Sequence, residues 1–298
     1  IKAAADLRGD RAPEILAQTT DILSFLAMPL SLNLARHKWT IELLQAVMLP
    51  VVAVPTTAGT GSEVGQAVVI TDDESHVKRV IFHQKMVPAI VILDPELTVG
   101  LPAKLTAATG MDALAHNVEA FCAPVYHPMA EGIALEGMRL VKDFLPRATK
   151  QGDDIDARLQ MQVASSMGAV AFQRGLGGIH AVSHSLGAVY DAHHGLLNAI
   201  VMPYMLQANR PVIEDEMARA ARYLDLPKQN FDGMLDWILD LRSELGIPHT
   251  LAEINIDDAQ AETIGAMSAK DVAGKTNPQR YDAAQYQAIF LKALRGEL

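Results

Sequence analysis

Residues 109–121 read Thr-Gly-Met-Asp-Ala-Leu-Ala-His-Asn-Val-Glu-Ala-Phe, a stretch that places Asp112 and His116 four residues apart. Its composition and its apolar periodicity predict a helix. Residues four apart lie on one face of a helix, so the carboxylate and the imidazole share a side. A single Asp/His pair of this kind is more often structural than functional, so the interpretation depends on partners elsewhere in the chain.

A second stretch, residues 178–195, supplies such partners. His180 and His184 repeat the four-residue step, and His193 and His194 follow. On an unbroken helix at about 100° per residue, His194 would return to within about 40° of His180. Gly187 and Gly195 argue against an unbroken helix. A new element starting at His194 would still leave this residue near the same site.

Three imidazoles and one carboxylate are a ligand set typical of Zn²⁺ or Fe²⁺, whereas Ca²⁺ and Mg²⁺ prefer oxygen ligands. Such a set leaves coordination positions open for a substrate oxygen. Spacing alone leaves open which of the four histidines bind the metal, because a His-x-x-x-His pair on a helix is itself a plausible pair of ligands: His180, His184, His193 and His194.

Composition limits the class of protein. The chain has 298 residues, of which 50% are hydrophobic and 20% charged, enough for a large core in one or two domains. A net charge of -10 disfavours nucleic acid or an anionic membrane as a partner, and favours a small molecule. Cys122 is the single cysteine, which excludes an internal disulfide and predicts a cytoplasmic location. No apolar run approaches the roughly 20 residues of a membrane helix.

The texture of the chain changes near residue 100. Apolar runs at 51–54 and 89–93 predict strands buried on both faces, as in an α/β layer. From Leu101 onward, Ala, Leu, Met and Glu recur at helical spacing. We therefore expect a partial α/β dinucleotide-binding domain over residues 1–100 and an all-helical metal-binding domain over residues 101–298.

A turn rich in threonine and glycine follows the first predicted strand. Residues 55–62, Pro-Thr-Thr-Ala-Gly-Thr-Gly-Ser, leave backbone N–H groups and hydroxyls free to meet phosphate oxygens. Its glycine spacing does not match the dinucleotide fingerprint, and residues 67–70 predict a strand where that fingerprint opens a helix. Taken alone, this Thr-rich turn is best interpreted as an ordinary hairpin turn.

Five segments together resemble the iron-containing (group III) alcohol dehydrogenases. They occur in the family's order over almost the whole chain: residues 55–63, 110–116, 178–187, 194–199 with the outline continuing to Pro203, and 276–278. The resemblance implies a dehydroquinate synthase-like architecture, with an α/β N-terminal part, here a truncated nucleotide-binding layer, and an all-helical C-terminal metal-binding domain. It also implies a set of ligands for Fe²⁺ or Zn²⁺: Asp112, His116, His180 and His194. His184 would then lie beside nicotinamide and substrate as a catalytic residue, and His193 would have no ligand role.

The same resemblance implies that NAD or NADP is the cofactor. The Thr-rich turn would contact the dinucleotide through Thr56, Thr57, Gly59, Thr60 and Ser62. Lys78 would lie near the cofactor ribose, with Arg79 and Lys85 as neighbouring candidates. The family's upstream Gly-Gly-Gly-Ser phosphate loop, and the acidic residue before it, have no match in this sequence. We expect them in an N-terminal segment outside this chain, which leaves the choice between NAD and NADP open.

These features predict a metal-dependent alcohol dehydrogenase or aldehyde reductase, which transfers a hydride between a small alcohol or carbonyl compound and NAD(P). A homodimer is compatible with this prediction. Two alternatives from other classes are a metal-dependent hydrolase using the same His/Asp site and a non-catalytic metal-binding module. A metal-dependent glycerol dehydrogenase or a metal-independent maleylacetate reductase would be related enzymes, and the complete ligand set argues against the metal-free one.

Overall fold

The structure of the chain, a computed structural model, describes residues 50–71, 78–82 and 84–298. The chain divides into two compact units, which are described separately. One comprises residues 1–49 and 68–85, and the other comprises residues 50–67 and 86–298. The second unit therefore holds the Thr-rich turn as well as every helix after residue 102. Where the dinucleotide-binding domain ends, near residue 100, stays a prediction.

The described strands form two small sheets. β1 (Val52–Ala53) pairs in parallel with β4 (Ile90–Val91), with Val52 opposite Ile90. β2 (Ala67–Thr71) and β3 (Lys78–Phe82) form a separate two-stranded sheet. The expected burial of β1 and β4 on both faces is wrong, since Val52 is 48% exposed and Ile90 is 55% exposed. Within the described residues this pair has no third strand beside it to cover those side chains.

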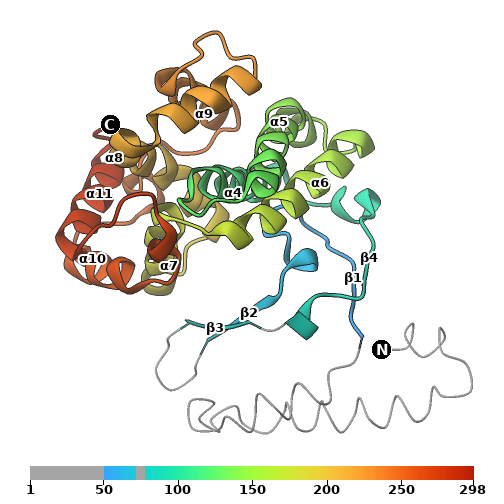
Figure 1. Cartoon of the computed structure of the whole chain (residues 1–298), viewed down its shortest axis with the longest axis horizontal. Helices are drawn as coiled ribbons and strands as arrows, with labels where there is room; N and C mark the ends of the chain where they lie inside the picture. Colours follow the sequence, from blue (N-terminus) through green and yellow to red (C-terminus); the bar gives the residue numbers. More distant parts are fainter. Residues whose placement is uncertain (1–49, 72–77, 83) are drawn as a thin grey trace, which may run out of the picture. The chain divides into compact units, whose positions relative to one another are not determined.

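Helices account for the rest of the chain (Figure 1). Every residue from 101 to 298 is described and none lies in a strand, which confirms the all-helical C-terminal part. None of the described helices has both the length and the apolar character needed to cross a membrane. The helices are α4 (Ala103–Cys122), α5 (Pro128–Lys150), α6 (Ile155–Ala171), α7 (Gly178–Tyr190), α8 (His194–Tyr223), α9 (Phe231–Glu244), α10 (Ala261–Lys270) and α11 (Ala283–Arg295), with short 3-10 turns at Ser62–Val64, Gln84–Met86, Pro95–Thr98, Phe172–Arg174, Ala252–Ile254 and Ala273–Thr276.

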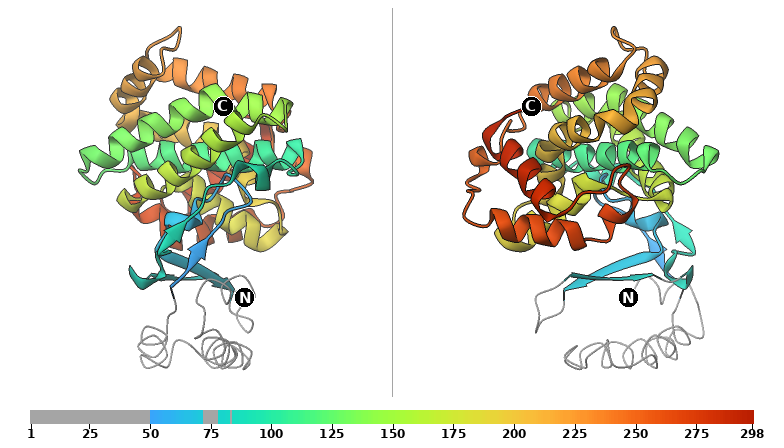
Figure 2. Two further views of the ribbon diagram at one scale, coloured as in Figure 1. Left: turned by 90° about the vertical axis from the view of Figure 1, so that its right-hand side faces the viewer. Right: turned by 60° about the vertical axis from the view of Figure 1, so that its left-hand side comes forward.

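Helix α4 lies at the centre of the helical unit. It packs against α5, α6 and α8, and the two views of Figure 2 show it enclosed by neighbouring helices. Every residue from 110 to 122 is buried, which is typical of a helix surrounded by other helices. Buried polar groups are costly unless they have partners. The acidic residues and the histidine of α4 are therefore expected to meet partners from other elements.

A break in the backbone separates α7 from α8. Asp191 has a φ of 52°, in the left-handed region, and ends α7. Two residues later, the Nδ1 atom of His193 accepts a hydrogen bond of 3.4 Å from the Leu196 N–H and caps the new helix. His194 is therefore the first residue of α8. The histidine-rich stretch is two elements rather than one continuous helix.

Candidate metal centre

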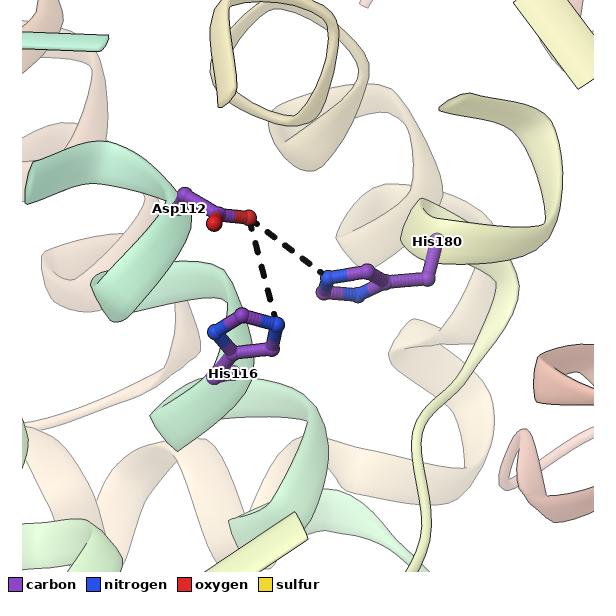
Figure 3. A group of neighbouring side chains, drawn as sticks. All are labelled: Asp112, His116 and His180. Carbon is purple, nitrogen blue, oxygen red and sulfur yellow. Dashed lines mark ion pairs between the residues drawn. The ribbon is translucent and has the colours of Figure 1, made fainter. Parts of the chain in front are cut away.

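A carboxylate and two imidazoles meet between α4 and α7. Asp112 and His116 project from the same side of α4, and His180 reaches them from the first turn of α7 (Figure 3). One ligand atom from each residue lies within 4.8 Å of the other two. All three residues are buried. The four-residue step of α4 thus supplies two of the three groups from one helix face.

Distances around Asp112 Oδ1 suit a small cation. Its separations from the Nε2 atoms of three imidazoles are 3.9 Å for His116, 3.7 Å for His180 and 3.4 Å for His194. Metal–ligand bonds of about 2.1 Å in tetrahedral geometry would put ligand atoms about 3.4 Å apart. Asp112, His116 and His180 form one compact group of ligand atoms, whereas His194 approaches Asp112 but lies outside that group.

Asn198, which lies one helical turn after His194 in α8, gives an independent sign of a cation site. Its Nδ2 atom lies 2.7 Å from Asp112 Oδ1, 3.2 Å from His180 Nε2 and 3.1 Å from His194 Nε2. The amide has two hydrogens for these three contacts. Its Oδ1 atom is buried and makes no hydrogen bond to the described residues. Hydrogen-bond acceptors therefore outnumber the hydrogens that Asn198 offers between Asp112, His180 and His194. A divalent cation bound there would satisfy the remaining acceptors.

Burial and mutual charge shift the protonation of the cluster. Burial raises the pKa of Asp112, but the neighbouring histidines, His116 foremost, outweigh it and hold that pKa far below the ordinary value. Burial lowers the pKa of His116 to about 4. The pKa of His180 rises to about 9, because Glu119 and Asp112 outweigh the effect of burial. An ionised Asp112 beside a neutral His116 suits a metal, whereas His180, with its raised pKa, must release its Nε2 proton before it can bind one.

The outer nitrogens of two imidazoles are also held. His180 Nδ1 lies 2.6 Å from Glu119 Oε2, and His116 Nδ1 lies 3.3 Å from the backbone carbonyl of Gly59. Carboxylate and carbonyl oxygens accept hydrogen bonds, so Nδ1 carries the hydrogen in both rings and Nε2 is the atom free to bind a metal. The sequence prediction missed Glu119 and Asn198. Helical spacing was the available signal, since Glu119 follows His116 by three residues.

His184 lies beside the cluster but faces a different partner. Its Nδ1 atom is 3.1 Å from Asp271 Oδ2, and its ring stacks on that of His194, with centroids 5.3 Å apart and planes 16° apart. Among the described residues, no hydrogen bond or ion pair joins it to Asp112. The prediction missed Asp271, which follows α10 and is remote in sequence. The side chain of His184 is 32% exposed, so a substrate could reach it.

The Thr-rich turn lies against the metal cluster through the Gly59 carbonyl. Gly59 itself is buried, and a Cβ atom there would lie 2.9 Å from the Thr109 carbonyl oxygen. Gly61 has a φ of 64°, where glycine is favoured. The remaining predicted contacts are solvent-exposed: Thr56, Thr57, Thr60 and Ser62. Lys78 is the first residue of β3, in the other compact unit, and its side chain lies outside the part of the molecule that the structure describes.

Comparison with known proteins identifies the family. Residues 106–294 match the profile of the Fe-containing alcohol dehydrogenase family, C-terminal, and residues 26–95 match that of iron-containing alcohol dehydrogenase. The chain is 42% identical to 4-hydroxybutyrate dehydrogenase of Cupriavidus necator, a match that covers 82% of this chain and 66% of the relative. It is 36% identical to the NAD-dependent methanol dehydrogenase of Bacillus methanolicus, with 83% and 67% covered.

Solved structures agree with the sequence comparison. A crystal structure of 1,3-propanediol oxidoreductase matches with a TM-score of 0.79 and 35% identity, over 82% of this chain and 66% of that one. The chain thus spans about two thirds of the length of these relatives. The family profile covers more than half of the chain, and its match includes the helices that carry the metal cluster. This chain belongs to the iron-containing alcohol dehydrogenase family.

Proposed function

We propose that the protein is a metal-dependent alcohol dehydrogenase or aldehyde reductase that uses NAD or NADP. The observation that carries the proposal is the convergence of three imidazole Nε2 atoms on one buried carboxylate oxygen, within 3.4 to 3.9 Å. Fe²⁺ or Zn²⁺ is the ion that this donor set fits. Its proposed ligands are Asp112, His116, His180 and His194.

The proposed chemistry is hydride transfer, in which a bound metal would polarise the substrate oxygen and the nicotinamide would take up or release the hydride. The residues of the chain hold and orient the groups that react. Asp112 supplies the negative charge of the site, and burial keeps the imidazole of His116 neutral. His184, one helical turn from His180 and partly exposed, is proposed to move the substrate proton while Asp271 holds its ring.

The Thr-rich turn is proposed to contact the dinucleotide. Its exposed hydroxyls and free backbone N–H groups suit phosphate oxygens, and its Gly59 carbonyl places it directly beside His116. The contacts proposed here are Thr56, Thr57, Gly59, Thr60 and Ser62, with Lys78 near the ribose. The similarity to the NAD-dependent methanol dehydrogenase of Bacillus methanolicus supports NAD as the first cofactor to test.

The substrate class is proposed to be short alcohols and the matching aldehydes. Methanol, 1,3-propanediol and 4-hydroxybutyrate appear in the names of the related proteins, and each carries a primary hydroxyl group. We also propose that the enzyme is cytoplasmic, that it forms a homodimer, and that it binds neither nucleic acid nor membrane.

The test is a redox assay of the protein after Fe²⁺ or Zn²⁺ has been restored. Those three alcohols and their aldehydes are offered with each nicotinamide cofactor, and absorbance at the nicotinamide band is followed. We expect turnover that needs both metal and cofactor. A protein that binds the metal but neither binds a nicotinamide cofactor nor turns over any compound of the panel would favour the hydrolase alternative, in which the same His/Asp site activates water.

A further inference from the structure

Glu119 is a buried carboxylate that belongs to no ligand set proposed above. It lies on α4, seven residues after Asp112 and three after His116, and so continues the face that carries both. The residue is 5% exposed. A buried carboxylate is costly unless its oxygens accept hydrogen bonds or meet positive charge. Its partners therefore indicate what it does.

Both oxygens of Glu119 accept hydrogen bonds from consecutive residues at the start of α7. Oε1 accepts from the Ile179 backbone N–H at 2.6 Å, and Oε2 accepts from His180 Nδ1 at 2.6 Å. The first bond anchors the helix end and the second orients the imidazole. A Cβ at position 177 would lie 2.8 Å from Glu119 Oε1, too close for van der Waals contact. Gly177, which has no side chain, leaves room for this arrangement.

The direction of the second bond controls the metal-facing atom of His180. With its hydrogen on Nδ1, the ring presents the Nε2 lone pair toward Asp112 Oδ1, 3.7 Å away. A carboxylate on the outer nitrogen also makes the imidazole a stronger ligand, and the loss of such a partner lowers metal affinity by roughly 10- to 100-fold.

We propose that Glu119 is a positioning residue of the metal centre, which acts through His180 by fixing its orientation and hydrogen placement. The proposal rests on the proposed function, because it assigns a metal to the cluster. Glu119 acts on the ion only through His180. The effect of Glu119 on metal binding is distinguishable from its effect on the end of α7, because a second side chain holds that end without a hydrogen bond to His180.

That second side chain is Asn277, whose Oδ1 accepts from the Gly178 N–H at 2.9 Å. Asn277 also exchanges hydrogen bonds with Asn209 and donates to the Gln279 carbonyl. Replacing it by alanine removes all four of these hydrogen bonds, one of which is made to the start of α7. None of the hydrogen bonds of Asn277 involves His180. Asn277→Ala is therefore a stringent control for a role limited to anchoring the helix.

The test compares Glu119→Gln, Glu119→Asp and Asn277→Ala with the wild-type protein. Each is stripped of metal, and its Zn²⁺ affinity is measured by competition with a chromogenic chelator. The absorption spectrum of the Co²⁺ form is recorded as well, because it reports ligand geometry directly. Glutamine matches glutamate in size but has one acceptor oxygen, so it cannot accept from both N–H groups. Aspartate keeps the negative charge, but its side chain is one methylene group shorter, so its carboxylate lies farther from His180 Nδ1.

We expect Glu119→Gln to bind Zn²⁺ 10- to 100-fold more weakly, with an altered Co²⁺ spectrum. Glu119→Asp should show a smaller loss, of about tenfold, and it decides the question if the glutamine variant does not fold. Asn277→Ala should stay within about threefold of wild type. Wild-type affinity and spectrum in both Glu119 variants would overturn the inference, as would an equal loss in Asn277→Ala. A wild-type protein that binds neither Zn²⁺ nor Co²⁺ would overturn the proposed function itself.

Discussion

Replacing His184 by asparagine separates metal binding from proton transfer. The ring of His184 packs beside His194 but makes its hydrogen bond to Asp271, at 3.1 Å. Asparagine removes the titrating group without opening the proposed coordination shell. We therefore expect the variant to keep its metal and to lose turnover.

The two expected effects differ in size. His184 is 32% exposed, so the loss of one partly solvated hydrogen bond should cost about 1 kcal/mol or less of folding stability. In a protein of this length that is a shift in Tm of about 2–4 °C at most. Removal of a general acid or base lowers turnover by roughly 10²- to 10⁴-fold, or about 2.7–5.4 kcal/mol in activation free energy. Turnover should therefore change far more than stability.

The assay pairs steady-state kinetics with metal analysis of the same sample. His193→Asn is the matched control, because it is the same substitution next to His194, and asparagine can still cap α8 in place of His193. The control should keep both metal and turnover. Metal loss from the His184 variant would refute the proposed ligand set. Full turnover with metal retained would reduce His184 to a packing residue.

Three further outcomes are expected. His194→Ala should lose metal and activity together, and unchanged metal content would remove His194 from the ligand set. Gly59→Ala should weaken dinucleotide and metal binding together. The new Cβ would lie 2.9 Å from the Thr109 carbonyl oxygen, so the turn must shift and carry with it the Gly59 carbonyl that meets His116 Nδ1. Titration calorimetry showing neither effect would contradict the proposed role of the turn. The metal-free protein should gain stability as pH rises from about 4 toward 6.5, because burial lowers the folded pKa of His116 to about 4. It should lose stability as pH rises further, from 6.5 through about 9, because the folded pKa of His180 is raised to about 9. Thermal melts across this range check it, and a Tm that does not vary with pH would be the contrary result.

Much of the site was readable from local spacing. Asp112 and His116 share a face of α4 because any helix brings residues four apart together, whatever surrounds it. The change in composition near residue 100 predicted helices throughout the C-terminal part, and no strand occurs there. The resemblance to the iron-containing alcohol dehydrogenases is confirmed by the family match over residues 106–294.

Other features lay beyond local spacing. The glycines of this stretch leave open whether His194 continues the helix of His180, and the left-handed conformation of Asp191 ends that helix before His194. The exposure of Val52 and Ile90 was also unexpected, because an apolar run predicts a strand but not how many strands lie beside it. Burial depends on neighbours that are distant in the chain.

The sequence by itself determined the residue types of the metal cluster, their helical spacing and the family to which the chain belongs. Only the tertiary structure decided which groups orient the imidazoles. Glu119 and His180 are 61 residues apart, and Gly59 and His116 are 57 residues apart. No periodicity links positions so distant, since their meeting depends on how α4 packs against α7 and on the path of the Thr-rich turn. Local hydrogen bonding sets the helices, but the contacts between distant segments set which nitrogen of His116 and of His180 is held by an oxygen and which one faces Asp112.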